Sequence, residues 1–365
     1  MKQLKGWIVA ITLLVLLSAC GQNEQESEAS GGTNASNDQQ EEQNEDNNVN
    51  DENNQENEVG LEETGKLTIY TSGPGGMAQA LVDAFEEKTG IQVDVFQGTT
   101  GDVLGRLEAE EGNPIADVVV LASLPPAMDY KDRGLTLSYE SPFANQLHDG
   151  WYDEEFHFYG FSASALGLSY NTNLVEEPPT DWSDLTDEKY NGKLAIPDPT
   201  QSGTARDFLA AFIHQEGDAG WEFLEQLKEN GLQLEGANNP ALQTVITGAN
   251  SVVMAGVDYM VYNNIANGEP VDIVFPSSGT MITPRPAFIL ETAKNVSSAQ
   301  QYIDFILSDE GQKIVADAYL IPARVDVAAA EDRLGMEHIE TLQYDWSFLE
   351  ENTQDILDRF MEIIR

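Results

Sequence analysis

Three short apolar runs alternate with helical patterns at the start of the long C-terminal part of the chain. The runs lie at 66–71, 91–97 and 116–122. Apolar residues at helical spacing follow the first two runs, and a short helical pattern follows the third. Continuous apolar strands between amphipathic helices predict a parallel sheet covered on both faces.

A second α/β region begins near residue 193. Strands are predicted in "KLAIP", at 251–255 and at 271–276, and helices follow the first two. Helical patterns near 299–319 and 346–364 close the chain, and the last one carries a single apolar face.

The first three strands all end in small or hydroxyl residues, within "TSGPGG", "GTTG" and "ASLPP". Because parallel strands end at the same sheet edge, these loops should converge. Hydroxyl and N–H groups at helix N-termini suit a small anion, although the same residues also cap helices. We favour a pocket, with these candidate ligand groups: Thr71, Ser72, Gly73, Thr99, Thr100 and Ser123.

The N-terminus carries an export signal. Lys2 and Lys5 precede the apolar stretch "GWIVAITLLVLLSA", which is short for a membrane span. "LSAC" ends at Cys20, the only cysteine, and resembles a bacterial lipobox. The resemblance implies a signal peptide at 1–19 and lipidation of Cys20. With no second cysteine, the mature protein cannot form an internal disulfide.

Residues 20–65 are predicted to form a disordered, lipid-anchored tether. The segment after Cys20 holds fourteen acidic residues and no basic residue, and it is poor in apolar residues. Its length favours a Gram-positive type of envelope. We therefore expect the protein on the outer face of the cell membrane.

The whole chain has a formal net charge of −45. A field of this sign argues against nucleic acid and anionic lipid as general partners. A nucleotide-dependent enzyme is the first rival hypothesis, since "GPGGMA" fits G-x-G-x-x-A and Asp94 lies about 20 residues on. However, the chain is exported, Asp94 lies inside a strand, and no P-loop lysine follows the glycines.

The order of motifs in the body resembles the solute-binding proteins of ABC importers, in the branch with iron(III), phosphonate, sugar-phosphate and thiamine receptors. The matching stretches span about 66–327. They include "FEEKTGIQVDVFQGTTGDVLGRLEAEEGNPIADVVV", "ALGLSYNTNLV", "DWSDLTDEKYNGKLAIPDPTQSGTA" and "AQQYIDFILSDEGQKIVADAYLIPARVDV".

The resemblance implies an α/β fold of two Rossmann-like lobes joined by crossing hinge strands, the periplasmic-binding-protein type II fold. Lobe one would be 66–165 plus 278–345, lobe two 168–275, and a C-terminal helix 346–365. A solute would bind in the cleft and be delivered to a membrane permease after hinge closure. We expect a monomer with no cofactor and no catalytic residue.

Three ligand classes remain open: a phosphate- or phosphonate-type anion, iron(III), and another small polar solute. Iron receptors of this family resemble one another in a tyrosine pair, but here Tyr259 is followed by Met260, and Tyr262 comes three residues later. The four histidines show no metal-ligand spacing. We therefore favour a phosphate- or phosphonate-type anion over iron, and no metal site. The further ligand candidates are Ser202, Gly203, Thr204, Asp258, Tyr259 and Arg285, with Arg206 as a weaker one.

Overall fold

The computed structural model describes residues 65–110 and 113–365. The predicted signal peptide, Cys20 and nearly all of the tether lie outside the described residues. No helix within the described residues is long and apolar enough to span a membrane.

The described body is built on strands in the order β2-β1-β3-β10-β5-β8-β6-β7. β1, β2 and β3 are parallel, and β10 is antiparallel to β3. Further along, β6 pairs with β7 and β8 in parallel. The bounds are β1 Lys66–Thr71, β2 Gln92–Gln97, β3 Val118–Val120, β4 Thr136–Leu137, β5 Tyr159–Asn171, β6 Leu194–Pro197, β7 Gln233–Glu235, β8 Val252–Val257, β9 Val271–Val274, β10 Ile282–Leu290 and β11 Ile321–Pro322.

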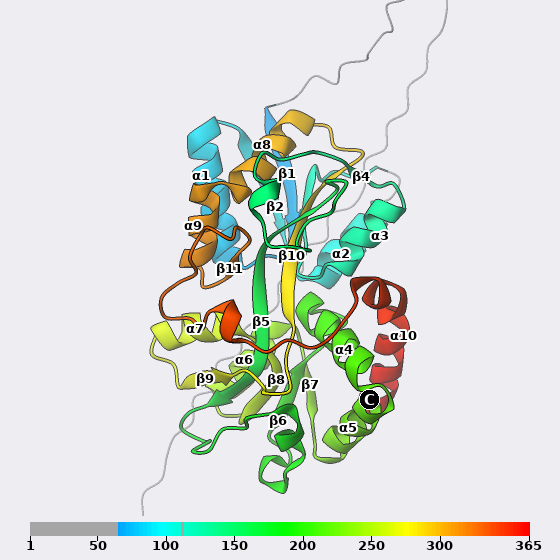
Figure 1. Cartoon of the computed structure of the whole chain (residues 1–365), viewed down its shortest axis with the longest axis vertical. Coiled ribbons are helices and arrows are strands. Elements are labelled where there is room, and N and C mark those ends of the chain that lie inside the picture. Colours follow the sequence, from blue (N-terminus) through cyan, green and yellow to red (C-terminus); the bar gives the residue numbers. More distant parts are fainter. Residues whose placement is uncertain (1–64, 111–112) are drawn as a thin grey trace, which may run out of the picture. The chain divides into compact units, whose positions relative to one another are not determined.

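β5 connects the two halves of the structure. Its first half pairs with β10 and β11, and its second half pairs with β8 and β9. Figure 1 shows β5 and β10 side by side through the middle of the body. We call the part around β1–β4 and β11 the first lobe and the part around β6–β9 the second lobe.

Helices cover the sheet in both lobes (Figure 1). In the first lobe these are α1 Gly75–Thr89, α2 Thr100–Ala109, α3 Pro125–Asp132, α8 Val296–Leu307 and α9 Asp309–Asp317. In the second lobe they are α4 Gly203–Glu216, α5 Asp218–Glu229, α6 Asn238–Ile246 and α7 Asp258–Ala266. The short 3₁₀ helices are η1 Ala144–Gln146, η2 Trp182–Thr186, η3 Glu188–Tyr190 and η4 Met336–His338.

The predicted C-terminal helix is present as α10, Trp346–Ile364. Its apolar face joins the core of the second lobe through Leu349, Leu357 and Phe360. It also contacts α3 of the first lobe, as well as α4 and α5. α10 therefore packs against both lobes.

The α/β prediction is confirmed, because the apolar runs form strands and the periodic segments form helices. The third run is shorter than expected, since only Val118–Val120 is paired as a strand. α6 and β7 were not predicted. β7 has a single apolar residue, Leu234, which gives no strand pattern. α6 does carry apolar residues at helical spacing, Ala241, Leu242 and Val245, so a signal for it was available.

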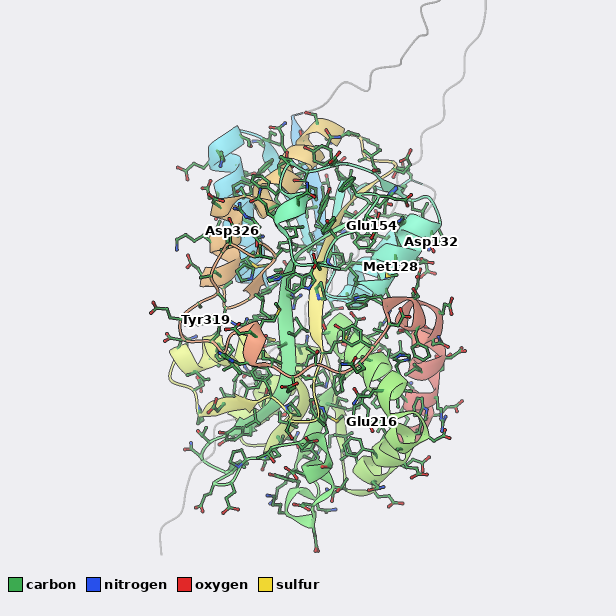
Figure 2. All side chains as sticks on the ribbon, viewed as in Figure 1. Met128, Asp132, Glu154, Glu216, Tyr319 and Asp326 are labelled. Atoms are coloured by element: carbon green, nitrogen blue, oxygen red, sulfur yellow. The ribbon has the colours of Figure 1, made fainter. Side chains whose placement is uncertain are left out.

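Acidic side chains lie on the surface of the body. Asp132, Glu154, Glu216 and Asp326 are all exposed, and Figure 2 shows them on the outside of both lobes. Water screens such charges, so they cost the fold little free energy.

Phe85 tests the core of the first lobe. Its ring is buried against Tyr302 and Phe305, at centroid distances of 5.3 and 5.7 Å. Phe85→Ala should lower the free energy of unfolding by about 3–5 kcal/mol, measured by urea denaturation. The control is Glu87→Ala on the exposed face of α1, which should stay within about 0.5 kcal/mol of wild type. Equal losses in both variants would contradict this packing.

Candidate functional site

The ends of β1 and β3 meet β10 at one edge of the sheet. Ser72 N donates to Val120 O at 2.9 Å, and Leu121 N donates to Pro286 O at 3.0 Å. β10 pairs Ala287 with Val120 in an antiparallel register. Arg285 and Ala122 each lie two residues beyond this pair, in the same direction along the sheet. Residues from β1, β3 and β10 thus converge at this edge.

Ser72 and Thr100 lie together at this edge. Their hydroxyl oxygens are 3.1 Å apart, and Thr100 Oγ1 accepts a long hydrogen bond of 3.4 Å from Ala122 N. Thr71 Oγ1 accepts from Gly73 N at 3.0 Å, which fixes the turn before α1. Ser72 and Thr100 are therefore the better candidates for ligand contact in this group, while Thr71 and Gly73 shape the loop.

Thr99 serves as a helix cap. Its side chain accepts from Asp102 N, and Asp102 accepts from Thr99 N, which makes a reciprocal capping box for α2. These bonds hold the pKa of Asp102 below its ordinary value. The alternative that the sequence left open, a cap, accounts for the contacts of Thr99.

The N-terminus of α4 brings the second lobe to the same edge. A Cβ atom on Gly203 would lie 2.6 Å from Thr100 Oγ1 and 2.8 Å from Ala122 O, so only glycine allows this approach. Ser202 caps α4 through Ala205 N. Ser202 and Thr204 also share hydrogen bonds with Asn238. The two lobes are therefore in contact at the candidate site.

Arg285 is the buried cation of the site. It is 1% exposed, and its Nη2 donates to Ser164 Oγ at a long 3.4 Å. Among the described residues its Nε has no hydrogen-bond partner, and neither do the buried hydroxyls of Ser162 and Thr283. Because β10 pairs Arg285 with Ser162 and Thr283 with Ser164, these groups form one patch on the crossing strands.

The electrostatics of this patch favour an anion. Burial lowers the pKa of Arg285, while Tyr259 and Asp258 act to raise it. The guanidinium lies 5.4 Å from the ring centre of Tyr259. No carboxylate among the described residues forms an ion pair with it. A buried charge without a partner is costly, and an anionic ligand would relieve that cost.

Asp258 is engaged by the protein itself. Its Oδ2 accepts from Arg333 Nη2 at 2.7 Å, and both side chains are fully buried. Burial raises its pKa, whereas Arg333 and the backbone N–H groups of Ala165 and Tyr259 act to lower it. These contacts give the carboxylate a structural partner, so a ligand role for Asp258 stays a prediction.

The two tyrosines considered for iron have different surroundings. Tyr259 faces Arg285, whereas the Tyr262 hydroxyl accepts from Leu334 N at 3.1 Å. Burial raises the pKa of both, which disfavours the tyrosinate form that binds iron(III). The described part of the chain contains no group of three or more His, Cys, Asp or Glu placed to hold a metal ion.

Ser123 is also bound within the protein. Its Oγ donates to Asp207 Oδ1 at 2.5 Å, and Leu124 N donates to Asp207 Oδ2 at 3.3 Å. Ser123 belongs to the first lobe and Asp207 to α4 of the second. Ser123 therefore makes a contact between the lobes, and its contact with an anion stays a prediction.

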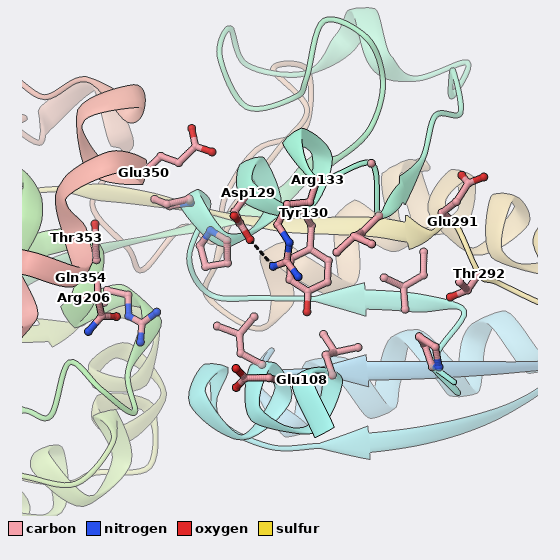
Figure 3. A pocket seen from close by; sticks show the side chains of 18 residues that line it. Glu108, Asp129, Tyr130, Arg133, Arg206, Glu291, Thr292, Glu350, Thr353 and Gln354 are labelled. Carbon is pink, nitrogen blue, oxygen red and sulfur yellow. Dashed lines mark hydrogen bonds and ion pairs between the residues drawn. The ribbon is translucent and has the colours of Figure 1, made fainter. Parts of the chain in front are cut away.

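A separate cavity of about 630 Å³ lies between α2, α3 and α10 (Figure 3). Leucines and prolines line much of it, and Arg206 lies beside Thr353 and Gln354 at one end. Apart from the weaker candidate Arg206, its lining includes none of the predicted ligand groups. The cavity is therefore distinct from the candidate anion site.

A family model for bacterial extracellular solute-binding proteins matches residues 113–352. The chain belongs to this family. A relative in Salmonella typhimurium is provisionally named as a 2-aminoethylphosphonate-binding periplasmic protein. This solute-binding protein is 25% identical to it over 298 residues, which cover 77% of the chain and 87% of the relative.

Solved structures of periplasmic binding proteins share the fold. AfuA from Actinobacillus pleuropneumoniae, with fructose-6-phosphate bound, superposes with a TM-score of 0.76 and 24% identity, over 82% of this chain and 98% of that one. Iron-bound HitA from Pseudomonas aeruginosa gives 0.74 and 24%, over 81% and 99%. At this identity the likeness shows the fold alone, and it confirms the type II prediction.

Several residues of the candidate site in this solute-binding protein were not predicted from the sequence. Ser162, Ser164 and Thr283 share the polar patch with Arg285, and their spacing of two along each strand was the available signal. Asp207 and Arg333 gave no such signal, because their partners lie 84 and 75 residues away.

The Asp258–Arg333 pair yields a prediction that separates structure from ligand contact. Asp258→Ala should lower the free energy of unfolding by about 3–5 kcal/mol, because it leaves the buried guanidinium of Arg333 without its carboxylate partner. Asp258→Ala combined with Arg333→Met should recover part of that loss, as measured by urea denaturation. If Asp258→Ala instead unfolds like wild type and loses solute affinity, Asp258 is a ligand group.

Proposed function

We propose that this protein captures a small organic phosphate or phosphonate between its lobes and delivers it to an ABC permease. The observation that carries the proposal is the buried Arg285. Within the part of the chain that the structure describes, its Nε and the neighbouring hydroxyls of Ser162 and Thr283 have no hydrogen-bond partner. A guanidinium provides several donors in a fixed plane, which suits a tetrahedral oxyanion.

Both lobes offer further groups to the same anion. Ser72 and Thr100 come from the first lobe, and the N-terminus of α4 at Gly203 comes from the second. Helix N-termini favour negative charge through their free N–H groups. An anion at this edge would therefore hold the lobes together, as expected for a receptor that closes on its solute.

Similar proteins also support the proposed ligand class. A name for 2-aminoethylphosphonate binding and a fold shared with a fructose-6-phosphate complex support an organic phosphorus anion. Iron(III) is the second candidate, supported by the fold shared with HitA and by Tyr259. The different surroundings of Tyr259 and Tyr262 favour the anion.

The remaining parts of the proposal concern the cellular setting. We propose a lipid anchor at Cys20 on the outer face of the membrane, a monomeric receptor and no catalysis. We also propose lobe bounds of 66–165 with 278–345 for the first lobe and 168–275 for the second. An exported α/β enzyme is the rival class, and turnover of the solute would distinguish it.

A thermal-shift panel tests the ligand class. The panel contains 2-aminoethylphosphonate, fructose 6-phosphate, inorganic phosphate and ferric citrate. A ligand at 100 times its Kd stabilises the native state by about 2.7 kcal/mol, so a true solute should raise the melting temperature by several degrees. We expect this rise with an organic phosphorus compound, recovered unchanged after the protein is unfolded.

Arg285→Met should abolish that rise without lowering the melting temperature of the ligand-free protein, because the variant removes a buried, unpaired charge. The matched control is Arg133→Met, which removes the same charge from an exposed ion pair with Asp129. If only ferric citrate raises the melting temperature and a visible tyrosinate absorbance appears, the solute is iron(III) and the anion proposal is wrong.

A further inference from the structure

Asp207 makes a hydrogen-bonded contact from the second lobe to the first. Its two carboxyl oxygens accept from Ser123 Oγ at 2.5 Å and from Leu124 N at 3.3 Å. Both donors lie between the end of β3 and the start of α3. The Asp207 side chain is 0% exposed. The contact can therefore exist only while the lobes are together.

This contact lies one helical turn behind the candidate anion site. Gly203 and Asp207 are four residues apart on α4, so they share a face of the helix. Gly203 packs on Thr100 and Ala122, and Asp207 reaches the next residues, Ser123 and Leu124. One face of α4 therefore contributes both to the candidate anion site, through Gly203, and to the contact between the lobes, through Asp207.

The charge of Asp207 is poorly compensated. Arg206 on the same helix is the cation that acts on it, and Tyr344, from the segment before α10, is the other titratable group near it. No ion pair involving Asp207 is found within residues 65–110 and 113–365. Burial raises its pKa to about 7, against the hydrogen bonds and Arg206, which act to lower it.

A protonated Asp207 fits the same contacts. Its hydroxyl can donate to Ser123 Oγ, and its carbonyl oxygen can accept from Leu124 N. The neutral form also lies near a bound anion without repelling it. When the lobes separate, water reaches the carboxyl group and its pKa returns toward about 3.9.

We propose that Asp207, with Ser123 and Leu124, is a proton-coupled latch that joins the lobes when the solute is bound. It is a positioning residue: it holds the N-terminus of α4 against the site and does not touch the solute. The solute used to test the latch is chosen from the proposed function. The latch itself is inferred from the contact of Asp207 with Ser123 and Leu124, whichever solute the protein binds.

The sign of the pH dependence follows from linkage. Between about pH 4 and pH 7 the separated form is ionised and the joined form is protonated, so binding takes up a proton. The Kd should then rise about tenfold per pH unit as the pH increases toward 7. Above about pH 7 both forms are ionised, and this effect levels off.

Three variants test the latch by calorimetry with 2-aminoethylphosphonate between pH 5 and pH 8. Asp207→Asn copies the hydrogen bonds of the protonated acid, so its Kd should lack this pH dependence and match that of wild type at low pH. Ser123→Ala and Asp207→Ala should weaken binding. The solute also changes its protonation state over this pH range, which affects the Kd of wild type and of Asp207→Asn alike. The difference between their pH profiles therefore reports on Asp207 alone.

A second measurement needs no solute. Spin labels on the full chain carrying Cys20→Ser, Glu87→Cys and Glu225→Cys report the distance between exposed sites on α1 and α5. The latch predicts a larger share of the short distance at pH 5 than at pH 8, and no such change in Asp207→Asn. Distributions that do not differ between these pH values in wild type would overturn it.

The two measurements separate the two proposals. If the wild type binds no organic phosphorus compound yet shows the pH-dependent distance, the solute assignment fails and the latch holds. If the wild type binds 2-aminoethylphosphonate with the same pH profile as Asp207→Asn, the latch fails and the solute assignment stands.

Discussion

The burial of a guanidinium at the crossing of β5 and β10 is the main electrostatic constraint on this molecule. Arg285 lies where the two lobes meet, in a patch of hydroxyl groups from both strands. Such a charge is tolerated in an interior only with a partner. In this protein the partner is proposed to be the solute. Binding an anionic solute would then neutralise the buried charge of Arg285.

Three other polar groups named for the site have partners within the protein. Asp258 is paired with Arg333, Thr99 caps α2, and Ser123 binds Asp207. The contrast with Arg285 identifies which polar residues are available to a ligand. These partners maintain the fold, whereas Arg285 Nε has no hydrogen-bond partner among the described residues and is proposed to bind the solute.

The lobes meet through close backbone packing as well as through charge. Gly203 approaches Thr100 and Ala122, and a Cβ on Gly101 would lie 2.8 Å from Thr200 O. These glycines allow two helix N-termini to approach the opposite lobe. The approach brings the N-terminus of α4 to the candidate anion site and allows Asp207 to bind Ser123.

The sequence by itself determined the local structure and the general location of the site. The apolar periodicity of β1, α1 and α4 is a property of neighbouring residues, and the loops after β1 and β3 converge because parallel strands end together. Only the tertiary structure decided which polar residues are free. The partners of Asp258 and Asp207 come from distant segments, and the burial of Arg285 depends on both lobes. Contacts of this kind follow from packing across the chain, and no local pattern encodes them.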